Sequence, residues 1–334
     1  MIFRKVLSIG VNLKSVNNAR NFYKCLLVLI AVQHEKPYNL RHLIPLNNTL
    51  PENLSFSGSP IKKVIMSLVN PIQTNPILAL AFKAARTAGK EMVRASTHLD
   101  SIKVDSKAFN DFVSEIDRQS EKIIINAISE LYPHHRITSE ETGSIGDEHS
   151  DFEWIIDPLD GTTNYLHGHP QYAISIAFLE KGVLKEALVY APEKNDLYTA
   201  TRGQGALLNN RRIRVANRIE LNQCLIGTGF PVVNQTKLNQ YFEILKDFIR
   251  QTAGARREGS AALDLCSLAC GRLDGFFEFN LKPWDIAAGA LIVREAGGIV
   301  TDMNGDSSWL QTGNIVAANP KLLAQMLQII AKHL

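Results

Sequence analysis

The sequence predicts a mixed α/β fold in which helices and meandering strands alternate in blocks. Residues 77–95 repeat small and apolar side chains at helical spacing, as an amphipathic helix does. Residues 172–180 and 184–190 are strand-like runs joined at Lys181-Gly182, a short hairpin signal. No pattern recurs with a period of about 20–50 residues, which argues against a solenoid or a propeller. The chain has 334 residues, 45% of them hydrophobic, enough for one large domain or two smaller ones.

Charge is unevenly distributed along the chain. Residues 1–65 contain nine Lys and Arg residues but only Glu35 and Glu52 as acids, a net charge of +7. The whole chain carries +3, so residues 66–334 carry −4. The basic character therefore belongs to the N-terminal segment, and strong direct nucleic-acid binding by the body is not expected.

The N-terminal segment has an apolar run, Cys25–Val32, of eight residues. A bilayer-spanning helix needs about 20, so no membrane span is expected. The basic flank is compatible with a signal or transit peptide, but no clear small-residue cleavage site follows. We interpret residues 1–65 as an extension, disordered or arising from a misassigned start, and residues 66–334 as the domain. Mass spectrometry of the native N-terminus tests this interpretation.

The four cysteines are Cys25, Cys224, Cys266 and Cys270. Cys266 and Cys270 are one helical turn apart, without a second pair or a histidine at zinc-site spacing. We expect buried core thiols rather than a disulfide framework or a metal site. This usage fits a reducing compartment and predicts a cytoplasmic location.

The first part of the body is predicted as two helices and a connecting loop. The helix at 77–95 is followed by polar residues 98–110, which predict the loop. A second amphipathic helix is predicted at 111–131 and is ended by Pro133. Its apolar side consists of Val113, Ile116, Ser120, Ile123, Ala127 and Leu131. Asp117 lies on or beside that side and is either an edge residue or a functional one.

The remainder is predicted as strands interrupted by helices. Strands are expected at 137–139, 154–156, 172–180, 184–190, 197–201, 206–208, 275–279, 299–302 and 314–318. Helices are expected at 237–251, 260–273, 286–296 and 320–333. Gly297-Gly298 ends the third of these helices and Asn319 opens the last. The Gly- and acid-rich residues 142–151 are expected to form a loop.

One nine-residue stretch carries the strongest functional signal. The apolar run Trp154-Ile155-Ile156 is followed by Asp157-Pro158-Leu159-Asp160-Gly161-Thr162-Thr163-Asn164-Tyr165. Mg²⁺ takes oxygen ligands, usually one or two carboxylates with substrate phosphate in other positions. Two carboxylates, two hydroxyls and free N–H groups at one strand end therefore indicate a phosphate-handling metal site. Asp-Pro-x-Asp-Gly is equally ordinary turn chemistry, so the stretch alone leaves a structural turn open.

Three further acidic features could join that site. Glu140-Glu141 follows the strand predicted at 137–139. Pro283-Trp284-Asp285 places an acid at the start of a helix, where a simple N-cap role is the alternative. Arg257-Glu258-Gly259-Ser260 opens another helix, whose free N–H groups can meet an anion or merely be capped.

Taken together, these motifs resemble the inositol monophosphatase family of Mg²⁺-dependent phosphatases. The sequence W-I-I-D-P-L-D-G-T-T-N-Y has S-E-E upstream and P-W-D-I-A-A-G downstream, and the likeness covers roughly residues 70–330. It is most similar to proteobacterial inositol-1-monophosphatases, through residues 199–206, 259–265 and 271–278. The resemblance implies a layered αβαβα sandwich, a homodimer and lithium-sensitive hydrolysis of inositol or sugar phosphates.

The resemblance also implies residue roles. Two or three Mg²⁺ per subunit are implied, the first held by Glu140, Asp157 and the carbonyl of Leu159, and the second by Asp157, Asp160 and Asp285. Thr162 would orient the attacking water, with Asp117 as its hydrogen-bond partner. Gly161, Thr162 and Thr163 would place N–H groups on the phosphate. Glu278 would grip an inositol hydroxyl, and Gly259, Ser260 and Ala261 would line the other side of the ring. The segment 101–111 matches a mobile loop over the metals.

The resemblance leaves alternatives open. Sister families hydrolyse fructose 1,6-bisphosphate or 3′-phosphoadenosine nucleotides, and the nucleotide enzymes usually carry Lys where Thr163 stands. Thr163 therefore favours inositol phosphates, without excluding other sugar phosphates or histidinol phosphate. Bacterial relatives also take part in ribosomal RNA antitermination with Nus factors and RNA polymerase. That binding role needs no catalysis and could coexist with it.

Overall fold

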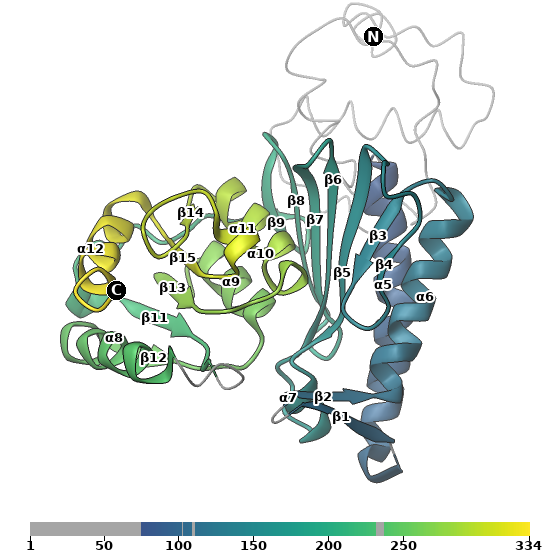
Figure 1. Cartoon of the computed structure of the whole chain (residues 1–334), viewed down its shortest axis with the longest axis horizontal. Coiled ribbons are helices and arrows are strands. Elements are labelled where there is room, and N and C mark those ends of the chain that lie inside the picture. Colours follow the sequence, from purple (N-terminus) through teal and green to yellow (C-terminus); the bar gives the residue numbers. More distant parts are fainter. Residues whose placement is uncertain (1–74, 102, 109–110, 232–236) are drawn as a thin grey trace, which may run out of the picture. The chain divides into compact units, whose positions relative to one another are not determined.

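The computed structural model describes residues 75–334, apart from residues 102, 109–110 and 232–236. The interpretation of residues 1–65 as an extension, and of Met66 as the start of the domain, lies outside the described residues. In the described part, layers of helix, sheet, helix, sheet and helix follow one another (Figure 1). This arrangement confirms the mixed α/β prediction and is the αβαβα sandwich that the family resemblance implied.

The first helical layer consists of α5 (Pro76–Ala95) and α6 (Glu115–Leu131). Asn75 begins α5 by accepting the N–H groups of Ile77 and Leu78 at 3.0 and 3.2 Å, as an N-cap residue does. Both helices pack against one face of the larger sheet, α5 on β7 and α6 on β5 (Figure 1). On α6 the buried apolar residues are Ile116, Ile124 and Ile128.

The connection between these helices differs from the prediction. The short 3-10 helix η3 (Ser96–Ser101) leads into an antiparallel hairpin of β1 (Val104–Ala108) and β2 (Asp111–Ser114). The predicted loop at 98–110 and the predicted helix start at residue 111 were therefore wrong. Ser114 caps α6, so the helix begins at Glu115, and at the other end Leu131 is 62% exposed rather than part of the apolar side.

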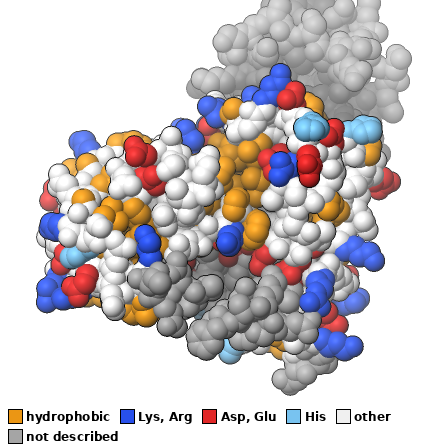
Figure 2. Space-filling view, in the orientation of Figure 1, with side chains coloured by type: hydrophobic (Ala, Val, Ile, Leu, Met, Phe, Trp, Pro, Cys, Tyr) orange, Lys and Arg blue, Asp and Glu red, His pale blue; other side chains and the backbone are white. Residues whose placement is uncertain are grey.

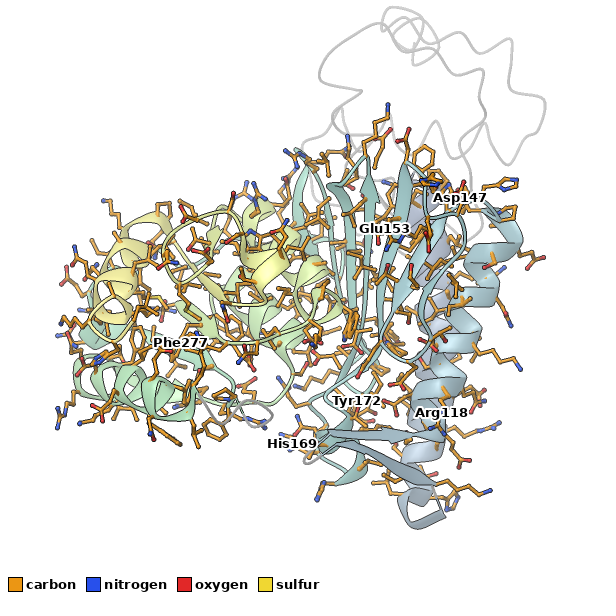
Figure 3. The ribbon with its side chains drawn as sticks, viewed as in Figure 1. Arg118, Asp147, Glu153, His169, Tyr172 and Phe277 are labelled. Atoms are coloured by element: carbon orange, nitrogen blue, oxygen red, sulfur yellow. The ribbon has the colours of Figure 1, made fainter. Side chains whose placement is uncertain are left out.

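The larger sheet has the strand order β10-β9-β8-β7-β6-β5-β3-β4. Its strands are β3 (Arg136–Ser139), β4 (Gly143–Ile145), β5 (Phe152–Asp160), β6 (Ala173–Glu180), β7 (Val183–Ala191), β8 (Asp196–Thr201), β9 (Gly205–Leu208) and β10 (Arg211–Arg212). Neighbouring strands are antiparallel except for β3 and β5, which are parallel. Because β3 and β5 run the same way, their carboxyl ends meet at one edge of the sheet. In Figure 3, Glu153 marks the beginning of β5, and Tyr172 and His169 lie near its opposite end.

The second sheet has the order β12-β11-β13-β15-β14. Its strands are β11 (Leu225–Thr228), β12 (Gly254–Arg256), β13 (Gly275–Glu278), β14 (Ile299–Thr301) and β15 (Ile315–Ala318). The strands β11 and β12 were not predicted, and neither was β4 in the larger sheet. Between the two sheets lie α9 (Ala261–Ala269) and α10 (Pro283–Glu295), packed in a continuous apolar core.

Helices α8 (Leu238–Gln251) and α12 (Pro320–Ile330) cover the outer face of the second sheet (Figure 1). Phe277 (Figure 3) packs there with Phe248 and Tyr241 in a second core. Two helix boundaries correct the prediction. Helix α9 ends before Gly271, whose φ of +75° is left-handed, and α10 begins at Pro283, which places Asp285 in its first turn.

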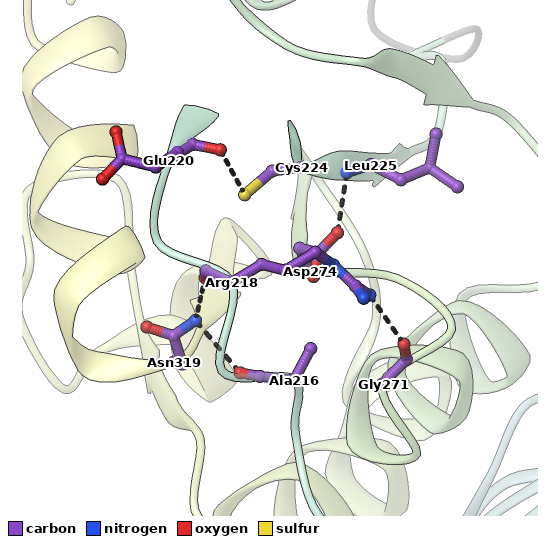
Figure 4. Close-up of polar contacts among 8 residues, drawn as sticks. All are labelled: Ala216, Arg218, Glu220, Cys224, Leu225, Gly271, Asp274 and Asn319. Atoms are coloured by element: carbon purple, nitrogen blue, oxygen red, sulfur yellow. Dashed lines mark hydrogen bonds and ion pairs between the residues drawn. The ribbon is translucent and has the colours of Figure 1, made fainter. Parts of the chain in front are cut away.

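A polar network ties the segment that links the two sheets to the second sheet (Figure 4). The buried Asp274 accepts Arg218 Nε at 2.7 Å and the N–H of Leu225 at 2.8 Å. Asn319 Nδ2 donates to the carbonyls of Ala216 and Arg218 at 3.2 and 2.8 Å. The network anchors the chain where it enters β11.

Cys224 and Cys266 are buried free thiols, and Cys270 is partly buried, whereas Cys25 lies outside the described residues. Across the described ranges, none of the helices combines the length and the apolar character that a bilayer crossing requires.

Candidate active site

Four carboxylates from three segments converge where β3 and β5 end. Glu140 follows β3, Asp157 and Asp160 lie in the last part of β5, and Asp285 lies in the first turn of α10. The charges of Glu140, Asp160 and Asp285 all act on Asp157. The structure therefore brings together the four acids that the sequence proposed as metal ligands.

A β-bulge places both acids of the Asp-Pro-Leu-Asp segment on the same face of β5. Asp157 pairs with Ser175 of β6, and Asp160 pairs with Ala173, so three steps along β5 match two steps along β6. In a regular strand, residues three apart point to opposite faces. The extra residue restores a common face, and Pro158 lies within the bulge, where a missing N–H is tolerated. The predicted turn is thus a bulged strand, and the chain turns only at Gly161, with φ +92°.

Burial and like charges raise the pKa values of this cluster. Asp157 is 2% exposed; burial is the largest cause of its strongly raised pKa, followed by the charges of Glu140, Asp160 and Asp285. The pKa of Asp285 rises to about 8 through burial and then through the charge of Asp160. Several buried carboxylates at close range repel one another, so they are stabilised either by protonation or by a bound cation.

Asp160 lies against the start of α9. Its Oδ2 accepts Ser260 Oγ at 2.5 Å and the N–H of Ala262 at 2.8 Å, and the N–H of Ala261 is a further partner. Burial raises the pKa of Asp160 to about 6, and these hydrogen bonds oppose the rise. The predicted ring-lining residues Ser260 and Ala261 are therefore in contact with a predicted metal ligand.

The donor set fits Mg²⁺ in its chemistry, because every predicted ligand is a carboxylate or carbonyl oxygen. Among the described residues, no three Asp, Glu, His or Cys side chains lie in positions that would hold a metal ion together. Asp285 Oδ2 accepts the N–H of Lys282 at 2.7 Å, and the Asp285 side chain is also hydrogen-bonded to Asp157. A hydrogen bond between two carboxyl groups requires a shared proton, which a divalent cation would replace.

Thr162 and Asp117 are hydrogen-bonded. Thr162 Oγ1 lies 2.9 Å from Asp117 Oδ1 and 3.1 Å from the carbonyl of Leu159, and it can donate to either. Asp117 Oδ2 accepts both the N–H of Ser114, at 2.9 Å, and the Ser114 hydroxyl. This Ser-x-x-Asp capping box fixes the carboxylate, whose pKa is raised by burial.

The turn after β5 is fixed by its neighbours. Gly161 begins α7 (Thr162–Leu166), and a Cβ at Gly161 would lie 2.9 Å from the carbonyl of Gln171. Asn164 Nδ2 donates to the carbonyls of Gln171 and Glu258, at 2.7 and 2.8 Å. Gly259 follows Glu258 with φ +86°, so the two glycine turns are joined. Thr163 lies on the exposed side of α7.

Glu278 lies at the end of β13, beside the main cluster. Burial raises its pKa to about 8, with the charges of Asp285 and Asp160 as the next causes and Arg257 opposing them. A Cβ at Gly229 would lie 1.8 Å from Glu278 Oε1, so any larger residue there would require this carboxylate to move. Burial, followed by the charge of Glu278, raises the pKa of the nearby Asp264.

The sequence prediction missed residues that support the site. Ser114 and Asn164 are two of them, and Ser120 and Glu121 on α6 are two more. Ser114-x-x-Asp117 is a recognisable helix-start signal. Asp117 and Glu121, four residues apart, also share a helix face with Ser120, but Ser120 was interpreted only as part of the apolar side.

A separate cavity of about 210 Å³ has Glu258 in its lining. Charged side chains from the described part line it, including Lys194, Asp196, Arg256 and Arg272. None of the predicted site residues lines this cavity, so it is not part of the carboxylate cluster.

The sequence of this chain matches a known family and several known proteins. The model of the inositol monophosphatase family matches residues 73–334. A SuhB protein of Neisseria meningitidis serogroup B is 71% identical over 259 residues, which are 78% of this chain and 99% of that protein. The Nus factor SuhB of Escherichia coli K12 is 46% identical over 253 residues, 76% of this chain and 95% of its own.

Solved structures of related proteins have the same fold as this chain. The extragenic suppressor protein suhB of Bartonella henselae matches with a TM-score of 0.75 and 40% identity, over 78% of this chain and all of that one. An inositol monophosphatase from Anabaena (Nostoc) sp. PCC 7120 matches with a TM-score of 0.69 and 34% identity, over 79% of this chain and 97% of that one.

Proposed function

The chain belongs to the inositol monophosphatase family, and from this we propose that it is a Mg²⁺-dependent phosphomonoesterase acting on myo-inositol 1-phosphate and related phosphates. The observation that carries the proposal is the convergence of Glu140, Asp160 and Asp285 on the buried Asp157. A cluster of four acids is costly in a fold unless it binds a cation. Its position beside the glycine turn after β5 suits a phosphate.

The carboxylates would hold the cations. Glu140, Asp157 and the Leu159 carbonyl would hold the first Mg²⁺, and Asp157, Asp160 and Asp285 would hold the second. The whole site would bind two or three Mg²⁺ ions per subunit. Bound Mg²⁺ would neutralise the phosphate and make hydroxide available near neutral pH. Asp157 can serve both sites because the bulge of β5 directs it and Asp160 to the same face.

The Thr162 hydroxyl would orient the attacking water. Its acceptors, Asp117 Oδ1 and the Leu159 carbonyl, direct its proton away from the substrate. The lone pairs of the hydroxyl are then left to accept a hydrogen bond from water. Asp117 is held by Ser114, so this direction is fixed before substrate binds.

The substrate would lie between the two glycine turns. The N–H groups of Gly161, Thr162 and Thr163 would contact the phosphate. Gly259, Ser260 and Ala261 would line one side of the alcohol, and Glu278 would accept one of its hydroxyl protons. Asp160 and Asp285 would border both the metal and the substrate.

A phosphate-release panel tests the proposal. The panel contains myo-inositol 1-phosphate, histidinol phosphate, fructose 1,6-bisphosphate and a 3′-phosphoadenosine nucleotide, with Mg²⁺, with EDTA, and with Mg²⁺ plus Li⁺. We expect Mg²⁺-dependent release that is fastest from the inositol ester and is inhibited by Li⁺. Release that EDTA leaves unchanged, or no release from any ester, would refute the proposal.

A second function is favoured by the names of the relatives, because the E. coli protein is a Nus factor. We propose that this chain also associates with Nus factors or RNA polymerase. Lys and Arg are interspersed with Asp and Glu on the face shown in Figure 2, which suits a protein partner better than bare RNA. Pull-down with the wild-type chain and with Asp157→Asn separates the binding role from the catalytic one. If both chains retain Nus factors or RNA polymerase, this association does not need catalysis.

Two further statements stay predictions. The family resemblance predicts a homodimer, which light scattering coupled to size exclusion tests. The cysteine usage predicts a cytoplasmic location, which fractionation tests.

A further inference from the structure

Helix α6 presents three buried polar side chains to the site. Asp117, Ser120 and Glu121 are all buried, with exposed fractions of 0%, 2% and 4%. Residues three and four apart lie on the same helix face. This polar patch faces β5, on which α6 packs, whereas Arg118, the residue after Asp117, lies on the exposed side (Figure 3).

Each of the three contacts a different segment of the site. Asp117 accepts the Thr162 hydroxyl at 2.9 Å. Ser120 Oγ donates to the carbonyl of Pro158, in the bulge of β5, at 2.8 Å. Glu121 contacts the turn that follows β3: Oε1 accepts the N–H groups of Glu141 and Thr142, both at 3.0 Å.

The Glu121 contact is the most extensive of these. Its second oxygen, Oε2, accepts the Thr142 hydroxyl. The three hydrogen bonds all have N–H or O–H donors, which is the set an ionised carboxylate accepts. Hydrogen bonds to an ionised group are stronger than neutral ones. The turn is thus held by a side chain from a helix in addition to the backbone pairing of Ser139 with Gly143 across it.

This contact fixes the backbone immediately after Glu140. The N–H of Glu140 itself donates to the carbonyl of Ile156 on β5, at 3.3 Å. The next two N–H groups are held by Glu121. The backbone that carries the Glu140 side chain is therefore held from both sides, by the larger sheet and by α6.

We propose that Glu121 is a positioning residue that holds Glu140 in place as a cation ligand. It does not touch the cation or the substrate; it fixes the turn from which Glu140 projects. The inference rests on the proposed function only in taking Glu140 as a ligand. Without the Glu121 carboxylate the turn loses three of the hydrogen bonds that hold it, and Glu140 is less well aligned with Asp157.

The test compares Glu121→Ala with Glu121→Gln and with a matched control, Glu130→Ala. Glu130 lies on the exposed side of the same helix. Gln keeps an acceptor oxygen for the two N–H groups, and the Thr142 hydroxyl can turn to accept from its amide. Three quantities are measured: hydrogen exchange of the peptide covering residues 137–145 in EDTA, Mg²⁺ binding by calorimetry, and kcat and KM on the best substrate of the panel.

We expect Glu121→Ala to speed exchange in that peptide and to weaken Mg²⁺ binding, each by about tenfold or more. At saturating Mg²⁺ the KM for substrate should stay within about twofold of the wild-type value, because the substrate contacts are untouched. Glu121→Gln should recover most of both properties, and Glu130→Ala should behave as wild type. Melting followed by circular dichroism reports whether each variant folds.

A folded Glu121→Ala protein whose exchange and Mg²⁺ binding equal those of Glu130→Ala would overturn the proposal. If Glu121→Ala does not fold, Glu121→Asp decides, because its carboxylate is withdrawn by about 1.5 Å and cannot reach the turn; unchanged exchange and binding there would overturn it equally. Exchange and calorimetry need no turnover. Absence of phosphatase activity in the wild type would therefore refute the proposed function and leave this test intact.

Discussion

Thr162 Oγ1 lies 2.9 Å from Asp117 Oδ1, although the two residues are 45 positions apart in the chain. The contact joins the first turn of α7 to the first turn of α6. It places a hydroxyl of fixed orientation beside the carboxylate cluster. The relationship leads directly to a kinetic prediction.

Thr162→Ala should lower kcat by about 100-fold and change KM much less, because it removes the group that orients the attacking water rather than a substrate contact. Thr162→Ser keeps the hydroxyl and should retain most of the activity. Steady-state kinetics of both variants measure this. Equal losses in the two variants, or a loss confined to KM, would contradict the assignment.

Asp157→Asn should remove Mg²⁺-dependent turnover, by about 1,000-fold or more, while the protein stays folded. The amide keeps the shape of the side chain but lacks the charge that two cation sites would share. Asp151→Asn is the control, because Asp151 is an exposed acid that directly precedes β5. Substantial activity in a folded Asp157→Asn protein would exclude the bridging role.

Glu278→Gln should change substrate preference more than the rate on simple esters. A carboxylate accepts two hydroxyl protons, whereas the amide offers one acceptor and one donor group. We expect about a tenfold loss of discrimination between myo-inositol 1-phosphate and a simple alkyl phosphate. The exposed Glu148→Gln serves as control; if Glu278→Gln ranks the esters as this control does, the assignment is wrong.

The stability of the metal-free protein should fall as pH rises. The folded-state pKa values are raised to about 6 for Asp160 and about 8 for Asp285 and Glu278. Between their ordinary values and these raised ones, the folded state binds more protons than the unfolded state, so the free energy of unfolding decreases with pH.

Urea unfolding in EDTA at several pH values, from about 5 to about 8, measures this trend. Saturating Mg²⁺ should flatten or reverse it, because a cation replaces the protons. A metal-free protein whose stability does not change with pH in this window would show that the carboxylates are not coupled as described.

Tyr165→Phe should destabilise the fold by about 1 kcal/mol. Tyr165 is fully buried, and its hydroxyl donates to the carbonyl of Met92 at 2.9 Å. That carbonyl also accepts the N–H of Ser96, so the loss is limited to one hydrogen bond. Denaturant unfolding compares the variant with Tyr132→Phe, which should be near neutral; equal effects would contradict the account.

The elements that the sequence predicted well are those whose signals are local. Helix α5 needs only its own apolar spacing, and α12 begins at Pro320, directly after the Asn319 cap. The hairpin of β1 and β2 was missed because Val113 and Ile116 match helical spacing across the boundary. The strand β4 was missed because its three residues lie within a Gly- and acid-rich stretch and form a strand only by pairing with β3.

The site residues, like the helices and strands, could be predicted where their signals are local and not where they depend on long-range contacts. The acids could be named from the motifs, but their common face could not, because the bulge at Pro158 is visible only in the pairing of β5 with β6. The roles of Ser120 and Glu121 depend on contacts with carbonyls and N–H groups that are distant in sequence. Backbone partners leave no residue-type signal, so sequence patterns cannot identify them.

The contact of Ser260 with Asp160 spans 100 positions, and Asp285 follows later still. This order matters while the ribosome makes the chain. Domains generally fold as units, and the strand β5, which carries Asp157 and Asp160, is synthesised well before α9 and α10. A nascent chain that ends before Pro283 holds the motif but lacks Asp285, so the complete ligand set cannot form until Asp285 has left the ribosome.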